Sequence, residues 1–310
     1  MSGEKFSLPR FFSKMYSKLP VFLKRLTGFA GPEELRVGKM PVRPAVEVES
    51  DVKDMGSMSP IVFLGEPDPQ KAHYSILPSK VSCLDDFIAR KGFERGSTIL
   101  ISGGAGTGKT TFALQSIYNG AMNGERGIYI SFEEQPEKIK LHMKENFGWD
   151  FDELERKGLV SILKVNPLEI ARSLEESKLG REGGLLVKLR QIELPFYPDR
   201  ICLDSLSALS ISFEKQESYR VYLRDIFEAL EKSNAVSFVL SETEQDPKVY
   251  SRTGVEEFLA DGVIVLYNIN KNGKRLNALE ILKLRSSKHK KDIIFYAITP
   301  KGIELSKSEK

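Results

Sequence analysis

The chain has 310 residues, 41% of them hydrophobic, a formal net charge of +3 and two cysteines, Cys83 and Cys202. This length fits one large domain with an extension or two small domains, and so small a net charge does not by itself indicate nucleic-acid binding. The widely separated cysteines argue against a disulfide framework or a cysteine zinc site and favour a reducing compartment. No apolar run approaches the ~20 residues that span a bilayer, and the first residues lack the apolar stretch of a signal peptide. We therefore expect a cytoplasmic protein.

The first 72 residues predict an N-terminal extension. Residues 1–30 hold six basic residues and one acidic residue, and the stretch 10–29 reads RFFSKMYSKLPVFLKRLTGF. Such a basic, aromatic and amphipathic stretch can dock on a partner or on the chain's own core, lie on a membrane surface, or bind nucleic acid. Residues 31–72 contain six prolines and little periodicity, which is typical of an extended linker. We expect the folded domain to occupy residues 73–310.

The segment ISGGAGTGKTTFALQ, residues 101–115, contains the complete pattern G-x-x-x-x-G-K-[ST]. Residues 98–102 before it predict a buried strand, and apolar residues after it recur at helical spacing, so the glycines form a strand-to-helix turn. Backbone N–H groups of such a turn surround an anion, Lys109 can reach the β- and γ-phosphates, and the Thr110 hydroxyl can bind Mg²⁺. The sequence therefore predicts a nucleoside-triphosphate site made by Gly104, Ala105, Gly106, Thr107, Gly108, Lys109, Thr110 and Thr111.

Further apolar runs after this loop predict an α/β fold. They are separated by helical patterns, such as the apolar spacing in 221–230, and this alternation favours a mainly parallel sheet covered by helices. Near the end, Asn272-Gly273 predicts a tight hairpin, so an antiparallel extension completes the sheet. The predicted strands after the loop are 127–132, 159–165, 200–204, 236–241 and 262–267.

Acidic residues stand at the ends of two of these strands. Asp204 ends the run RICLD, and Glu133 and Glu134 follow YISF at 129–132. Carboxyl ends of parallel strands share one edge of the sheet, so these carboxylates can face the bound phosphates. Asp204 is then the acid on the Mg²⁺ side, and Glu133 or Glu134 can activate or orient an attacking water.

A series of motifs resembles the KaiC-like branch of the RecA-type ATPases over about residues 77–305. The motifs are the P-loop and its helix, then SFEE, GWD, LDSLSALS, GVEEFLAD and LEILKLRSSKHKK. The resemblance implies a RecA fold, ATP as the nucleotide, and a homo-oligomeric ring, often hexameric, with ATP between subunits. It also implies that Glu133 and Glu134 are the catalytic carboxylates, and that a neighbour inserts Lys283 and Arg285 against the γ-phosphate.

The resemblance has limits. The clock protein of this family has two tandem ATPase domains, whereas this chain has one P-loop, and Glu256 and Glu257 stand where its autokinase half has phosphorylatable residues. Clock function and self-phosphorylation therefore do not carry over. The segment SETE ends the strand after Asp204 and resembles the family's γ-phosphate sensor, which points to Thr243 and Glu244. The extension has no counterpart in the family that we recognise.

Three functions remain open from the sequence. The first is an assembly-dependent, Mg²⁺-dependent ATPase that acts as a regulatory or signalling switch. The second is a scaffold that holds ATP with negligible turnover, like the archaellum subunit of this family. The third is a recombinase-like ATPase stimulated by DNA, which the lack of a separate DNA-binding module disfavours.

Overall fold

The computed structural model describes residues 59–64, 66–68, 71–173, 191–244, 250–271 and 273–306. Contacts group residues 55–310 into one compact unit. The basic stretch 10–29 lies outside the described residues, so the expectations placed on it stay predictions. Among the described helices, none combines the length and the apolar character needed to cross a bilayer.

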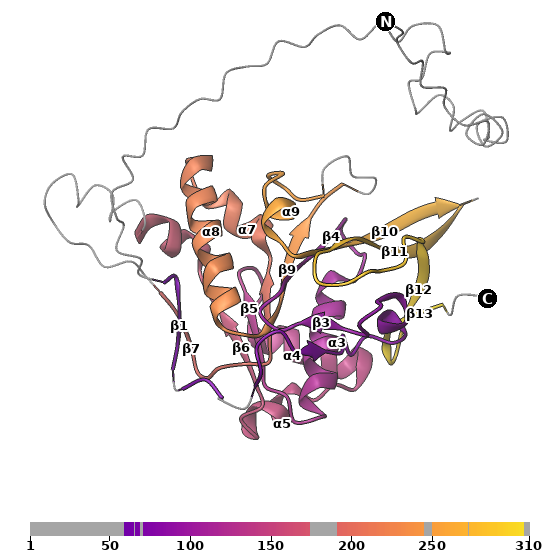
Figure 1. Cartoon of the computed structure of the whole chain (residues 1–310), viewed down its shortest axis with the longest axis horizontal. Helices are drawn as coiled ribbons and strands as arrows, with labels where there is room; N and C mark the ends of the chain where they lie inside the picture. The colour runs from indigo at the N-terminus through magenta and orange to yellow at the C-terminus, as the bar shows by residue number, and fades with distance from the viewer. Residues whose placement is uncertain are drawn as a thin grey trace, which may run out of the picture. The chain divides into compact units, whose positions relative to one another are not determined.

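Strands and helices are interspersed along most of the described chain, and the last four strands follow one another without a helix (Figure 1). The strands are β1 (Ile61–Phe63), β2 (Ile76–Leu77), β3 (Phe93–Glu94), β4 (Thr98–Gly103), β5 (Gly127–Ser131), β6 (Val160–Lys164), β7 (Ile192–Leu194), β8 (Arg200–Asp204), β9 (Val236–Glu242), β10 (Gly262–Lys271), β11 (Lys274–Leu284), β12 (Ile294–Thr299) and β13 (Gly302–Leu305). The helices are the 3-10 helix η1 (Leu84–Phe87), α3 (Lys109–Ala121), α4 (Pro136–Phe147), α5 (Phe151–Arg156), α7 (Leu206–Ile211), α8 (Gln216–Lys232) and α9 (Glu256–Leu259).

Nine of the described strands form the central sheet, in the order β13-β12-β11-β10-β4-β9-β8-β5-β6. The strands from β10 to β6 pair in parallel, and β10 to β13 pair antiparallel. The predicted fold class is therefore confirmed: the sheet is mainly parallel, flanked by helices, and extended by an antiparallel C-terminal region.

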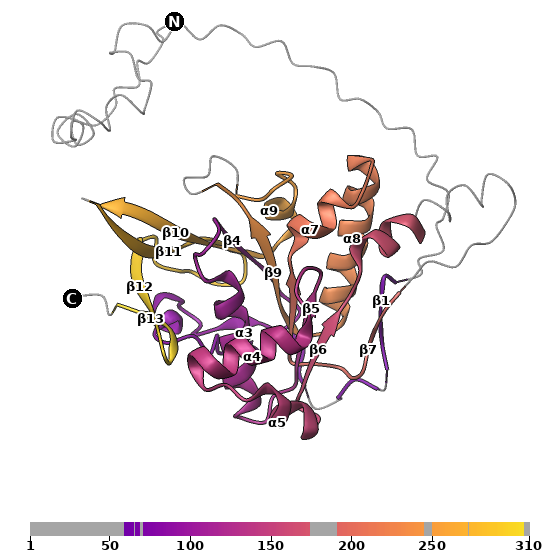
Figure 2. The ribbon, with the colours of Figure 1, turned by 180° about the vertical axis from the view of Figure 1, so that it is seen from behind.

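The core has two layers, one on each face of the sheet. One apolar cluster contains the buried side chains of α3, α4 and α5, and the other contains those of α7 and α8. Figures 1 and 2 show α8 and α7 on one side and α3, α4 and α5 on the other. Strand β4 lies in the middle of the sheet, which explains why all six of its residues are buried. A strand covered on both faces reads as a continuous apolar run rather than an alternating one.

Local sequence signals set the helix ends. Pro136 opens α4, where its missing N–H costs no hydrogen bond, and Gly148 ends it in the left-handed conformation at φ 71°. The Asp150 side chain accepts a hydrogen bond from the amide of Glu153 and caps α5, and Ser205 caps α7 in the same way. Helix α8 buries one face that includes Leu223, Ile226 and Leu230 and exposes the other.

The antiparallel end of the sheet is a long hairpin followed by two shorter strands. The register pairs Lys271 with Lys274, as the two-residue turn predicted at Asn272-Gly273 requires. Strand β10 pairs with β4 only through residues 262–266, so the outer part of the β10–β11 hairpin extends beyond the parallel sheet (Figure 1).

Two features before the P-loop have no periodic signal in the sequence. Strand β1 lies in the segment expected to be linker, and it pairs in parallel with β7 over Ile61–Phe63. Buried charges hold the chain near residues 71–79. Asp199 accepts hydrogen bonds from the side chains of Lys71 and Arg95, and the fully buried Arg200 donates to the Pro78 carbonyl at 2.7 Å.

Candidate functional site

The P-loop joins β4 to α3 through two glycines with positive φ. Gly106 has φ 76° and Gly108 has φ 87°, a region that residues with a Cβ rarely adopt. Gly108 is the N-cap of the 13-residue helix α3, and its carbonyl accepts the amide of Phe112. The loop therefore presents the positive end of a helix to the space above it, which is the arrangement that binds phosphates.

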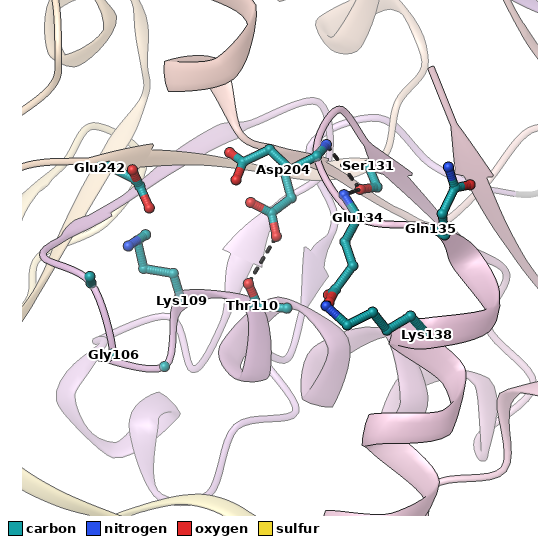
Figure 3. Close-up of a pocket in the computed structure, with 12 residues that line it drawn as sticks. Gly106, Lys109, Thr110, Ser131, Glu134, Gln135, Lys138, Asp204 and Glu242 are labelled. Carbon is teal, nitrogen blue, oxygen red and sulfur yellow. Dashed lines mark hydrogen bonds and ion pairs between the residues drawn. The ribbon is translucent and has the colours of Figure 1, made fainter. Parts of the chain in front are cut away.

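A cavity of about 680 Å³ lies over this helix end (Figure 3). That volume is in the range of a nucleotide-sized ligand. The cavity collects side chains from the carboxyl ends of β5, β8 and β9, as expected for an open α/β sheet. Its lining residues are Ala105, Gly106, Gly108, Lys109, Thr110, Ser131, Glu133, Glu134, Gln135, Lys138, Asp204 and Glu242.

Lys109 is folded back onto its own loop. Its Nζ donates to the carbonyls of Gly103 at 2.9 Å and Gly104 at 3.1 Å, and the residue is only 8% exposed. Burial lowers the pKa of Lys109, while three surrounding carboxylates act in the opposite direction: Glu242, Asp204 and Glu133. A phosphate at the loop would give this ammonium a negative partner in place of two neutral carbonyls.

Asp204 and Thr110 form the predicted pair on the metal side. The Thr110 hydroxyl donates to Oδ2 of Asp204 at 2.9 Å, and the Tyr129 hydroxyl donates to the same oxygen (Figure 3 shows the first bond). Burial raises the pKa of Asp204, and these two hydrogen bonds oppose that rise. Mg²⁺ commonly takes one or two protein oxygens and completes its shell with phosphate and water, so this donor set fits the ion. No cluster of three acidic, histidine or cysteine side chains suited to a metal occurs in the described part of the chain.

Glu133 and Glu134 diverge in the structure. Glu133 accepts a hydrogen bond from the Ser205 hydroxyl at 2.5 Å and so lies next to Asp204. Glu134 instead pairs with Lys138, in the first turn of α4, at 2.7 Å, and its side chain points that way in Figure 3. Both line the cavity, but in this conformation only Glu133 is held against the β8 end of the site.

Glu242 is a functional candidate that the sequence analysis missed. It ends β9, lines the cavity, and pairs in register with Gly103, the first glycine of the P-loop pattern. Neither Thr243 nor Glu244 lines the cavity, although the amide of Thr243 donates to the Gly103 carbonyl at 3.2 Å. The sequence does carry a signal for Glu242, because an acidic residue directly follows the apolar run of a strand. The same pattern predicted the role of Asp204.

Some predicted P-loop residues support the loop rather than face the cavity. The Thr107 hydroxyl donates to the Gly104 carbonyl at 2.8 Å, and Tyr296 of β12 donates its hydroxyl to the Thr107 carbonyl. Thr111, the second helical threonine, does not line the cavity. A methyl group built on Gly108 would lie 2.9 Å from Cδ1 of Ile298, so β12 packs closely over the loop. The C-terminal strands thus hold the P-loop in place.

Lys283 and Arg285 lie away from this cavity. They flank Leu284, which pairs with Gly262, and Gly262 pairs with Ile99 at the start of β4. The P-loop follows the other end of β4, and at ~3.3 Å per residue Ile99 and Gly103 are ~13 Å apart along this strand. Lys283 donates to the Ala260 carbonyl at 2.6 Å, and Arg285 donates to the Phe258 carbonyl at 3.0 Å. The sheet therefore keeps both cations away from the chain's own phosphate site.

The sequence of this domain matches a known protein family. Residues 77–310 match the family model described as "ATPase: KaiC". The chain belongs to the KaiC family of ATPases. It is 32% identical over 252 residues to the circadian clock oscillator protein KaiC of Parathermosynechococcus lividus, which covers 77% of this chain and 45% of that protein. It is also 32% identical over 221 residues to the circadian clock protein KaiC3 of Synechocystis, covering 71% of this chain and 43% of that protein.

The KaiC fold is also shown by a solved structure. The KaiC-like protein PH0186 from the hyperthermophilic archaeon Pyrococcus horikoshii OT3 superposes with a TM-score of 0.62 at 30% identity, covering 76% of this chain and all of that one. The chain spans less than half of the length of the curated KaiC relatives above, 45% and 43%. Membership of the KaiC family confirms the RecA-type ATPase domain predicted from the ordered motifs.

Proposed function

We propose that this chain is an ATP-binding, Mg²⁺-dependent ATPase whose hydrolysis depends on assembly into a homo-oligomeric ring. One observation carries the proposal: the cavity gathers four carboxylates around the P-loop, yet no arginine of the described residues lines it. The two candidate cations, Lys283 and Arg285, lie beside the opposite end of β4. A second copy is then the source of the arginine. Such a ring suits a regulatory or signalling switch, and family resemblance favours a hexamer.

The proposal assigns roles to the P-loop and to three carboxylates of the cavity. The P-loop amides and Lys109 bind the phosphates, and Thr110 and Asp204 hold Mg²⁺, which neutralises charge on the phosphate oxygens. Glu133 orients the attacking water and accepts its proton, because it is a cavity carboxylate fixed by the Ser205 hydroxyl. Glu242 lies across the loop, where it can respond to the γ-phosphate through Lys109.

The cations of a neighbouring copy supply the largest rate effect. Charge builds on the transferred phosphoryl oxygens, and an arginine delivered from outside is worth ~10³–10⁵ in rate. That range corresponds to about 4–7 kcal/mol of barrier. The isolated chain is then a slow enzyme that binds ATP without rapid turnover.

A second candidate is a scaffold that holds ATP without significant turnover. Two observations favour it: Lys109 is bonded to P-loop carbonyls, and Glu134 is engaged by Lys138. Both groups have to move before they can act on ATP. In this case nucleotide binding controls assembly, and the carboxylates serve the metal alone.

ATP turnover over a protein concentration series distinguishes the two candidates. We would follow oligomer mass by light scattering and phosphate release per chain, with Arg285→Ala measured alongside. The ATPase predicts turnover that rises with assembly and falls at least ~10³-fold in the variant. A ring that binds ATP with no turnover at any concentration would leave only the scaffold.

The proposal extends to the remaining parts of the chain. We also propose a cytoplasmic location. Residues 1–72 are then an extension, and residues 73–310 are the ATPase domain. Residues 10–29 then contact a partner protein or a membrane surface, which vesicle binding with and without these residues tests. Stimulation of turnover by DNA, sensitive to salt, would instead favour a recombinase-like role.

A further inference from the structure

Tyr129 is a fully buried tyrosine in the middle of β5. Its hydroxyl donates to Oδ2 of Asp204, the oxygen that also accepts the Thr110 hydroxyl. Tyr129 is not part of the P-loop pattern or of the acidic strand ends, and it does not line the cavity. The roles proposed above therefore leave this hydrogen bond without a function.

The sheet register brings Tyr129 to Asp204. Tyr129 pairs with Cys202 on the neighbouring strand β8, and Ser131 pairs with Asp204. Side chains alternate along a strand, so Tyr129, Cys202 and Asp204 project from the same face of the sheet. A phenol is long enough to reach the diagonal neighbour two residues along the adjacent strand. The contact is thus built from two rigid central strands.

Packing alone does not require the hydroxyl. Tyr129 belongs to the same apolar cluster as Cys202 and the α3 side chains Phe112 and Ile117, where a phenylalanine ring would fill the same volume. A buried hydroxyl costs free energy unless it is hydrogen-bonded, and this one has a carboxylate as its partner. The interaction that distinguishes tyrosine from phenylalanine at this position is therefore the hydrogen bond to Asp204.

Two donors on one oxygen orient the carboxylate. Thr110 and Tyr129 both donate to Oδ2, and no described residue forms a hydrogen bond to Oδ1. Thr110 belongs to the proposed metal site, whereas Tyr129 is enclosed in the core, where its hydroxyl lies against Asp204 and Thr110. We propose that Tyr129 is a positioning residue that fixes the Asp204 carboxylate so that its other oxygen is presented to the Mg²⁺ of bound Mg·ATP.

The inference rests on the proposed function, because it assumes that Asp204 serves Mg²⁺. The test compares the full-length chain with Tyr129→Phe and with Tyr219→Phe. Tyr219 is the matched control: it is also buried, and its hydroxyl donates to a carboxylate, Glu256, at 3.0 Å, away from the cavity. Calorimetry would measure the affinity for a non-hydrolysable ATP analogue in EDTA and in excess Mg²⁺.

We expect Tyr129→Phe to bind the analogue in EDTA as tightly as the wild type does. The factor by which Mg²⁺ raises the affinity should be about tenfold smaller in Tyr129→Phe than in the wild type. A hydrogen bond to a charged group has a value in this range. Tyr219→Phe should keep the full gain. In an Asp204→Asn background, Tyr129→Phe should change the gain no further, because the group that it positions is already altered.

Other outcomes overturn the inference in distinguishable ways. A wild-type Mg²⁺ gain in Tyr129→Phe, or an equal loss in EDTA and in Mg²⁺, would make the hydroxyl merely structural. A wild type without any Mg²⁺ gain would remove the proposed metal role of Asp204, and this inference with it. Thermal unfolding followed by Trp149 fluorescence checks that each variant is folded at the assay temperature.

Discussion

Glu133 and Glu134 are neighbours in the chain with different surroundings in the fold. The Ser205 hydroxyl holds Glu133 beside Asp204, whereas Glu134 forms an ion pair with Lys138 of α4 at 2.7 Å. The amides of both residues approach the Ser131 hydroxyl, which shapes the turn after β5. The structure therefore separates two acids that the sequence analysis treated together.

We predict that Glu133→Gln lowers turnover ~10²–10⁴-fold while ATP affinity stays within about threefold. The amide keeps the shape and the hydrogen bond from Ser205 but cannot accept a proton from water. Phosphate release under single-turnover conditions measures the effect on the chemical step. Glu134→Gln is the matched control and should cost much less, since its carboxylate already has a lysine partner. Equal losses in both variants would mean that Glu134 leaves Lys138 when ATP binds.

Two acidic residues at strand ends, Asp204 and Glu242, differ in how well the sequence predicts them. Asp204 was identified because an apolar run ends in an acid at the shared edge of the sheet, and the structure places it beside Thr110. Glu242 has the same signal but lies inside the SETE segment, where family resemblance drew attention to its neighbours. Only the register of β9 against β4 shows that Glu242 is the residue opposite Gly103.

At the scale of elements, buried ion pairs fasten the chain before the P-loop to the sheet. Asp199 is 3% exposed at its side chain and pairs with Lys71 at 2.8 Å and Arg95 at 2.7 Å. It also accepts the amide of Arg126 at 2.8 Å. One carboxylate thus joins three segments that are far apart in the sequence, at the base of β8.

We predict that Asp199→Asn lowers the free energy of unfolding by about 3 kcal/mol at pH 7, because it leaves two cations without their buried partner. Urea unfolding followed by Trp149 fluorescence measures the change. Glu228→Gln is the control: it breaks the exposed pair between Glu228 and Lys232 on α8 and should change stability very little. A similarly small change in Asp199→Asn would show that the segment is held by apolar contacts instead.

The same variant has a predictable pH dependence. Burial acts to raise the pKa of Asp199, but the Lys71 ammonium, the Arg126 amide and the Arg95 guanidinium together hold it below its usual range. The stabilisation is therefore fully present above the ordinary carboxyl pKa of about 3.9 and is lost as the pH falls through the lower value of the folded state. The difference between wild type and Asp199→Asn should shrink below about pH 4.

At the scale of the whole molecule, the cations and the acids lie toward opposite ends of the same strand. The P-loop follows the carboxyl end of β4, and Lys283 and Arg285 flank the residue that pairs beside its first residues. Both cations are held on carbonyls of residues 257–260, so their orientation is set within the chain itself. Arg285 remains 55% exposed at its side chain, which is compatible with the proposed contact with a second copy.

We predict that two inactive variants restore activity when mixed. Glu133→Gln lacks the acid and Arg285→Ala lacks the cation, so each should be inactive alone. A mixed ring contains interfaces where an intact Glu133 meets an intact Arg285, and up to about a quarter of wild-type turnover should return at equal amounts. The size of that fraction follows from random pairing of neighbours. Phosphate release after co-incubation measures it.

The control for this experiment is a mixture of Glu133→Gln with Lys109→Ala. Glu133 and Lys109 line the same cavity, so every chain in this mixture has a defective cavity. Turnover should therefore stay absent. Recovery of turnover in this mixture would contradict the prediction. Absence of recovery in the first mixture, despite mixed oligomers, would show that Arg285 does not act on the cavity of a neighbouring copy.

Local signals in the amino-acid sequence were enough to predict the fold class and the P-loop. These signals are local: period and length of apolar runs, the spacing of G-x-x-x-x-G-K-[ST], and acids at strand ends. Tertiary structure decided what depends on register and packing across distant segments. It separated Glu133 from Glu134, brought Glu242 opposite Gly103, joined β1 to β7, and set Tyr129 against Asp204. It also placed Lys283 and Arg285 away from their own P-loop, because the direction and register of β11 determine at which end of the sheet these residues lie.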